Sequence, residues 1–139
     1  MAERHFLADV VGINPTFTAE PWYNPYGDCL VYKMADEASV ADRIDELLTI
    51  YRSAIDNRPI GFQIKGIAAI IQKFGLAGLE IASQADVASM KSVSVAAILL
   101  AAYEDRPFTL SRRIGYAEAM ECDHPRRGAR IPVSELQPA

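Results

Sequence analysis

Hydrophobic and polar residues alternate through much of residues 28–65, which is the pattern of strands with one buried side. The first stretch, 28–34, places Leu30, Tyr32 and Met34 on the same side, so we expect a strand there. Residues 35–40 are mostly polar and small and predict a turn. Residues 41–52 predict a second extended segment, although its first part, 42–46, could instead form a helical turn.

The third predicted strand, 60–65, follows a tight connection that contains Asp56, Asn57 and Pro59. Asparagine and aspartate tolerate left-handed backbone, and proline cannot donate a hydrogen bond into a sheet. Residues 60–65 then alternate cleanly, with Phe62 and Ile64 on one side and Gln63 on the other. The sequence therefore predicts a hairpin of 47–52 with 60–65.

Apolar residues with helical spacing follow the predicted strands. Ile67, Ile70, Ile71 and Phe74 lie at positions i, i+3, i+4 and i+7, so we expect a helix at 67–74 that lies across the sheet. Residues 76–90 are compatible with a short helix or a strand, and 111–121 predict a last amphipathic helix.

A longer helix is predicted at 92–104, and it is apolar nearly all round. Such a helix must be buried on most of its sides. A second subunit would bury it, or it would be a central helix wrapped by the N-terminal and C-terminal segments of its own chain. The pattern alone leaves both arrangements open.

Together these elements predict an α+β fold, an antiparallel β-meander of about three strands followed by helices that pack on one face. The length of 139 residues fits a single domain. We divide it into an irregular aromatic lead-in (1–27), a strand-strand-strand-helix core (28–74), a helical part (75–121) and an irregular tail (122–139). The aromatic rings of the lead-in would cover the sheet or form the rim of a ligand or partner site.

Composition and charge narrow the class of protein. A hydrophobic fraction of 50% indicates a folded globular chain, and a net charge of −4 disfavours nucleic acid and anionic membranes as partners. The longest apolar run, 95–103, is less than half of the roughly 20 residues that cross a bilayer. Cys29 and Cys122 lack a short spacing and favour unpaired thiols, and the N-terminus does not have the form of a signal peptide. We therefore expect a cytoplasmic protein.

Four polar side chains of the predicted strands form the candidate ligand-binding site: Tyr32, Tyr51, Arg52 and Lys65. If adjacent strands bring them to one face, their hydroxyl, guanidinium and ammonium groups would favour an anionic ligand. The alternative is that these residues form simple cross-strand pairs.

The segment 106–130 holds six of the ten arginines of the chain. Such a segment could clamp a phosphate or carboxylate, because guanidinium groups bind these anions in bidentate fashion. We favour the alternative that it pairs with the acidic residues at 36–46, either within the chain or across a subunit boundary.

No catalytic residue, metal site or cofactor is predicted. Cys122, Asp123 and His124 are all types that bind metal, but neighbours in sequence rarely point at one ion, and the other histidine is His5. The same geometry argues against a Cys–His nucleophile pair. The acidic residues at 42, 45 and 46 are expected to be solvated, and no phosphate loop or serine elbow is present.

Residues 27–66 contain three short motifs: Gly27-Asp28-Cys29-Leu30-Val31-Tyr32, then Asp42-Arg43-Ile44-Asp45 leading into Leu48-Thr49-Ile50-Tyr51, and Ile60-Gly61-Phe62-Gln63-Ile64. In these motifs the chain resembles a family of small uncharacterised bacterial β-meander domains of unknown function. The resemblance implies a compact antiparallel meander, bacterial origin and self-association. It implies no activity and no functional residue, and it does not extend to the lead-in or the C-terminal half.

Our leading functional hypothesis is a non-enzymatic binding or assembly module that forms a homo-oligomer, most simply a homodimer, through the helix at 92–104 or a sheet edge. The extent of that apolar segment motivates it. The alternative hypothesis is a small enzyme or ligand-binding protein that acts on an anionic small molecule in a pocket beside the sheet.

Overall fold

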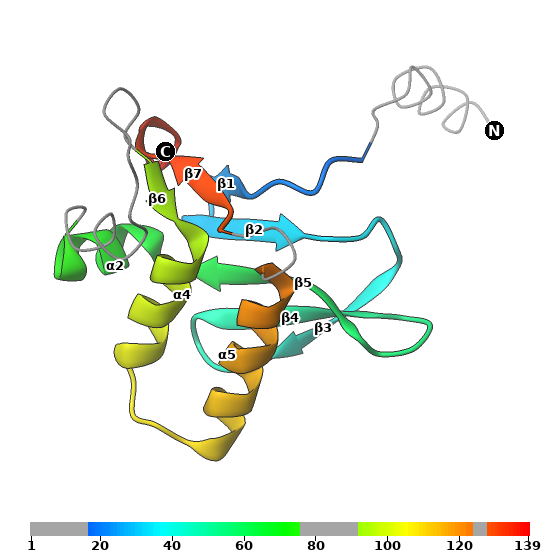
Figure 1. The fold of residues 1–139 in the computed structure, drawn as a ribbon. Helices are drawn as coiled ribbons and strands as arrows, with labels where there is room; N and C mark the ends of the chain where they lie inside the picture. The colour runs from blue at the N-terminus through cyan, green and yellow to red at the C-terminus, as the bar shows by residue number, and fades with distance from the viewer. Residues whose placement is uncertain (1–16, 76–91, 124–127) are drawn as a thin grey trace.

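The computed structural model describes residues 17–75, 92–123 and 128–139 (Figure 1). Its main sheet is antiparallel, in the order β1-β2-β5-β4-β3. The strands are β1 (Trp22–Asn24), β2 (Cys29–Lys33), β3 (Ser39–Arg43), β4 (Leu48–Ser53) and β5 (Pro59–Lys65). The helices α2 (Ile67–Phe74), α4 (Val95–Glu104) and α5 (Leu110–Asp123) pack on one face of it. A small sheet pairs β6 (Ser92–Ser94) with β7 (Arg130–Pro132), which is followed by the 3-10 helix η2 (Val133–Glu135).

The mixed α+β class, the antiparallel sheet and the helices on one face are confirmed, but the strand count and order differ from the prediction. The main sheet has five strands, not about three, and β2 pairs with β5 rather than β3, so the sheet is not a simple meander. The extended segment expected at 41–52 is in fact two strands, β3 and β4, and the turn expected at 35–40 contains the start of β3. β3 lies at the edge of the sheet and none of its residues is buried, so its sequence has no apolar alternation to detect.

Where one side of an element is buried, the predictions were accurate. The β4–β5 hairpin, the strand at β2 and the helix at 67–74 all occur as expected. Within the lead-in and the tail, which were expected to be irregular, β1 and β7 form strands of three residues each. The segment 76–90 lies outside the described residues.

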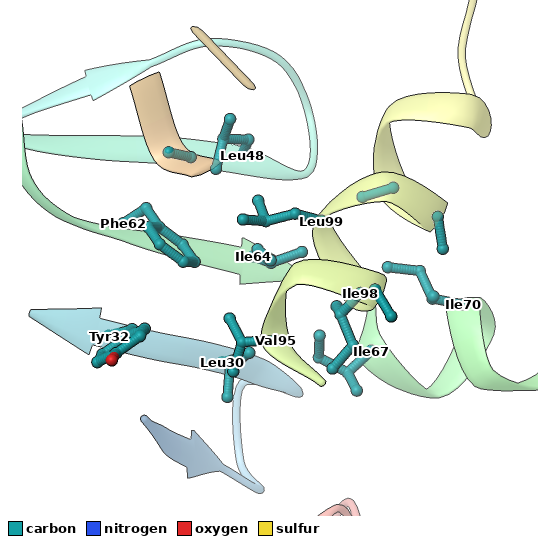
Figure 2. Packing of buried hydrophobic residues seen from close by; sticks show 14 of the residues in the cluster. Leu30, Tyr32, Leu48, Phe62, Ile64, Ile67, Ile70, Val95, Ile98 and Leu99 are labelled. Atoms are coloured by element: carbon teal, nitrogen blue, oxygen red, sulfur yellow. The ribbon is translucent and has the colours of Figure 1, made fainter. Parts of the chain in front are cut away.

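The core forms where α4 lies on the inner face of the sheet. Leu30, Ile64 and Leu48 form one cross-strand row of fully buried side chains. Ile98 and Leu99 of α4 point toward these strands, with α2 beside them (Figure 2). Burying the apolar side chains of α4 and of the sheet against one another removes them from water, which stabilises the fold. The helix predicted at 92–104 is therefore a central core helix, buried by its own chain, with 92–94 forming β6 instead.

The turn between β1 and β2 fixes the start of α2. Asp28 adopts a left-handed conformation with a φ of 50°, and its carbonyl accepts a hydrogen bond from Gly66 at 3.0 Å. Its carboxylate accepts one from the amide of Ala68 at 3.1 Å and another from the hydroxyl of Tyr23 at 2.6 Å. A helix start leaves several amides without intrahelical partners, so Asp28 caps α2 from another part of the chain.

Gly115 lets α5 approach the turn between β3 and β4. A Cβ atom at this position would lie 2.6 Å from Cγ2 of Ile44 and 2.8 Å from its Cγ1. Glycine costs a helix about 1 kcal/mol relative to alanine, so close contact is the physical reason for a glycine in the middle of α5.

We expect Gly115→Ala to destabilise the protein by about 1–2 kcal/mol, because the new methyl group overpacks this contact. In an Ile44→Ala background, the same substitution should be neutral or stabilising, since the obstructing side chain is gone and alanine favours the helix. Urea unfolding of the four proteins in this double-mutant cycle measures the coupling. Additive effects would show that α5 does not meet Ile44 in this way.

Candidate functional site

The structure does not bring the four predicted ligand-binding residues together. Tyr32 is 1% exposed and lies in the core, with its ring edge-on to Phe62 at a centroid distance of 5.8 Å. Arg52 also points to the helix side, where it binds Asp42 and Glu118. Tyr51 and Lys65 lie on the opposite, outer face of the sheet. The expectation of a shared face was wrong because neighbouring residues of a strand, such as Tyr51 and Arg52, point to opposite faces.

On the outer face, Tyr51 belongs to a polar cluster with Lys33 and Gln63. The ammonium of Lys33 lies 5.0 Å from the centroid of the Tyr51 ring, and the Tyr51 hydroxyl donates a 2.9 Å hydrogen bond to Oε1 of Gln63. Lys65 follows two residues after Gln63 on β5 and is exposed. Tyr51 and Lys65 therefore share the outer face with Lys33 and Gln63, which were not predicted to be part of the site.

A second candidate site is an apolar groove between α4 and α5. One hollow of about 230 Å³ is lined mainly by apolar and aromatic side chains, among them Leu100, Tyr103 and Met120. A wider hollow of about 510 Å³ continues from it past Phe108 and Leu110, and Tyr103 and Arg113 line both. Arg113 is thus the one charged group among the lining residues. Arg113 belongs to the arginine-rich segment 106–130, but no pattern in the sequence pointed to this groove.

Arg112, the neighbour of Arg113, is buried and connects three parts of the fold. Its Nε donates a 2.8 Å hydrogen bond to Oδ2 of Asp45 in the turn between β3 and β4. Its terminal nitrogens donate to the carbonyls of Ala102 and Tyr103 at the end of α4 and of Arg106 and Pro107 in the following loop. All five donors of the guanidinium are therefore used, which is the condition for burying such a group without a large penalty.

Two aromatic rings enclose this guanidinium. Its central carbon lies 5.1 Å from the ring centroid of Tyr103 and 5.1 Å from that of Tyr116. The Tyr116 hydroxyl also donates a 2.9 Å hydrogen bond to Oδ2 of Asp45. Cation–π contacts of this kind strengthen when they are desolvated, so the rings help to hold Arg112 in place.

Asp45 is held as a carboxylate although it is largely buried. Burial alone would raise its pKa, but hydrogen bonds from Arg112, from the amides of Leu48 and Leu47, and from Tyr116 outweigh it and lower the pKa. Burial raises the pKa of Tyr116, so this hydroxyl stays protonated and available as a donor. The cluster is a structural ion pair: Asp45 and Arg112 line neither hollow, and Tyr116 is among the lining residues of the smaller one.

Two of the four described arginines of the segment 106–130 pair with the acidic residues at 36–46, as we favoured from the sequence, and they do so within the chain. Arg112 binds Asp45, and Arg106 lies 3.4 Å from Glu46. Contrary to the expectation for Asp42 and Asp45, these carboxylates are not simply solvated, because Asp42 binds Arg52 at 2.9 Å and Asp45 binds Arg112. Arg126 and Arg127 lie outside the described residues.

The described residues contain no cluster of three metal-ligating side chains. Cys29 lies in β2 and Cys122 at the end of α5; both are buried, and they are not joined by a disulfide. His5 and His124 lie outside the described part of the chain, so the Cys-Asp-His triplet cannot be built from it. Among the described helices, none combines the length and the apolar character that crossing a bilayer requires.

Comparison with protein-family models, with curated proteins and with solved structures finds no match for this chain. The resemblance of residues 27–66 to a bacterial domain family therefore stays a prediction. The described residues offer two candidate binding surfaces, the α4–α5 groove and the outer face of the sheet.

Arg112→Met is expected to lower the free energy of unfolding by about 3–5 kcal/mol, because it leaves Asp45 as a buried charge without its partner. Arg58→Met is the matched control, since Arg58 forms two ion pairs at the surface, with Glu37 and Asp56, and surface pairs contribute little. Urea unfolding of both variants measures the difference. Equal, small losses would mean that the Arg112 cluster does not hold α5 to the sheet.

The stability that Asp45 provides should depend on pH. Its pKa is lower in the folded protein than in the unfolded chain, so its contribution is complete above the unfolded pKa of about 3.9 and is lost as pH falls through the folded value. Asp45→Asn should therefore be less stable than the parent at pH 7, and the difference should shrink below about pH 4. Unfolding curves between about pH 7 and about pH 2 test this. A difference that is constant with pH would contradict it.

Proposed function

We propose that this chain is a non-enzymatic binding module that forms a homodimer through the α4–α5 groove. The observation that carries the proposal is a group of exposed apolar side chains around that groove. Leu100 is 47% exposed, Phe108 70% and Leu110 72%, and each of them lines one of the two hollows. Isolated apolar residues are common at protein surfaces, but a contiguous group around a hollow is typical of an interaction site.

The shape of this surface favours a second protein chain over a small molecule. A ligand in the 230 Å³ hollow would leave Phe108 and Leu110 in water. A protein surface would cover the hollow and these side chains together. It would also place aromatic and arginine side chains at the centre of the contact, where interfaces concentrate their binding energy.

The charges around the groove favour a second copy in particular. Arg113 on α5, Glu104 at the end of α4 and Glu121 on α5 are exposed, and none forms an ion pair with another described residue. In a twofold interface each surface patch meets the same patch of the partner. A patch that carries both a cation and carboxylates is electrostatically complementary to itself, so Arg113 of each subunit can pair with a glutamate of the other.

The sheet edge is a weaker candidate for the interface. β3 is an edge strand of five residues that includes Asp42 and Arg43, and charged edge strands resist pairing with another sheet. α4 contributes to the proposed interface through its C-terminal margin at Leu100, Tyr103 and Glu104, because most of the helix is covered by its own chain.

Light scattering coupled to size exclusion should show a dimer at micromolar concentration. Leu110→Glu should weaken dimerisation by about 30-fold or more, because it places a charge in an apolar contact. Ile55→Glu is the matched control, since Ile55 is 85% exposed in the β4–β5 connection, away from the groove. Arg113→Glu should also weaken the dimer, and Glu104→Arg in the same chain should restore part of the affinity. A parent protein that is monomeric at these concentrations would overturn the proposal.

A further inference from the structure

The outer face of the main sheet, opposite the helices, carries positive charge although the chain as a whole is acidic. Cross-strand pairing assigns Lys33, Arg43 and Lys65 to this face, and none of the outward positions of the five strands is Asp or Glu. The strand carboxylate Asp42 points to the helix side and binds Arg52. In a chain with a net charge of −4, this is a local surface of positive charge.

Glycine allows the centre of this face to form. Gly61 lies between Lys33 and Tyr51 in one cross-strand row. A Cβ there would lie 2.6 Å from the carbonyl oxygen of Tyr32, 2.8 Å from Cα of Lys33 and 3.0 Å from its Cγ. The missing side chain lets Lys33 lie across Gly61 toward the ring of Tyr51, so the cation and the ring form one platform.

The groups on this face can donate hydrogen bonds to an anionic ligand as well as attract it by their charge. The Tyr51 hydroxyl donates to the carbonyl oxygen of the Gln63 side chain, which leaves the amide group of Gln63 to donate elsewhere. Trp22 shares a cross-strand row with Gln63 through Val31, and its ring is 56% exposed. Glu37 reaches the margin of the face at Ser53, where Arg58 neutralises it.

We propose that the outer face of the sheet binds single-stranded nucleic acid. Lys33 and Lys65 lie on the same face, separated by about 13 Å along the strand direction, since Lys33 is opposite Gly61 and Lys65 is four residues further along β5. Neighbouring phosphates of a nucleic-acid strand lie closer together than this, so the two cations suit phosphates that are not adjacent in an extended strand. Trp22 and Tyr51 supply ring faces on which bases stack, and Gln63 supplies a donor between them.

Other anionic ligands fit this face less well. Small molecules bind in concave sites, and neither of the two hollows described above includes a residue of the outer face. An acidic peptide would use the lysines, but it has no flat groups for exposed Trp22 and half-buried Tyr51. A duplex hides its base faces, so it would use the cations alone.

Fluorescence anisotropy with a labelled oligouridine of about 12 nucleotides, a length within the usual site size, tests the proposal. An oligothymidine, a duplex and a polyglutamate peptide of the same length serve as competitors. We expect micromolar binding of the single strands at about 50 mM salt that weakens steeply by about 200 mM. Absence of binding, or equal competition by polyglutamate or the duplex, would overturn the proposal.

Substitutions locate the site. Lys33→Gln with Lys65→Gln should weaken binding about tenfold and reduce the salt dependence by about two released ions. Trp22→Ala should weaken it about fivefold or more, because a base loses its stacking partner. Lys73→Gln is the matched control, since Lys73 pairs with Asp105 on the helix side and should leave binding unchanged. Lys65→Gln alone guards against a folding defect, because Lys65 is exposed. Binding that survives the double substitution would place the nucleic acid elsewhere.

This inference is independent of the proposed dimer, because the α4–α5 groove and the outer face lie on opposite sides of the sheet (Figure 1). Leu110→Glu should therefore weaken dimerisation without removing the intrinsic affinity for one oligonucleotide. The two lysine substitutions should weaken nucleic-acid binding and leave the dimer intact. Each outcome thus tests one proposal without the other.

Discussion

The buried pair of Arg112 and Asp45 is the interaction on which the arrangement of helices over the sheet depends. One guanidinium binds the turn between β3 and β4, the end of α4 and the loop that leads to α5. Burying an unpaired arginine would cost far more than one hydrogen bond returns, so this side chain tolerates only the geometry in which all its donors are used. The orientation of α4 and α5 over the sheet is therefore fixed by this cluster as well as by apolar contacts.

That orientation decides which surfaces remain open. Because α4 packs against the sheet, α2 and α5, most of its apolar side chains are buried in the core, and Leu100 is its one exposed apolar side chain. Arg112 and Arg113 are adjacent on α5 and point in different directions, one into the core and one to the groove. An apolar helix in a sequence thus indicates burial, but which chain buries it depends on the tertiary arrangement.

The parts of the fold that the sequence predicted are those in which one side of an element is buried and the other is not. β5 and α2 were located closely because their apolar periodicities are complete. β3 was missed because an edge strand without a buried residue has no such periodicity, and β1 because three residues are too few to show one. The candidate site was the least accurate prediction. Alternation within β4 already separates Tyr51 from Arg52, and which residues of different strands share a face depends on the strand register, which no local pattern supplies.

The ion pairs also explain why the net charge of the chain was an incomplete guide to the ligands that its surface favours. Carboxylates at positions 42, 45 and 118 are engaged by Arg52 and Arg112 on the helix side of the sheet. Those charges cancel where they are, and they do not offset Lys33 and Lys65 across the thickness of the sheet, because exposed charges act over roughly 10 Å in salt. A sum over the sequence counts all of these groups equally, whereas a ligand meets one face at a time. The separation of paired charges on one side from unpaired cations on the other is therefore a property of the fold, and it is what gives an acidic chain a surface suited to an anion.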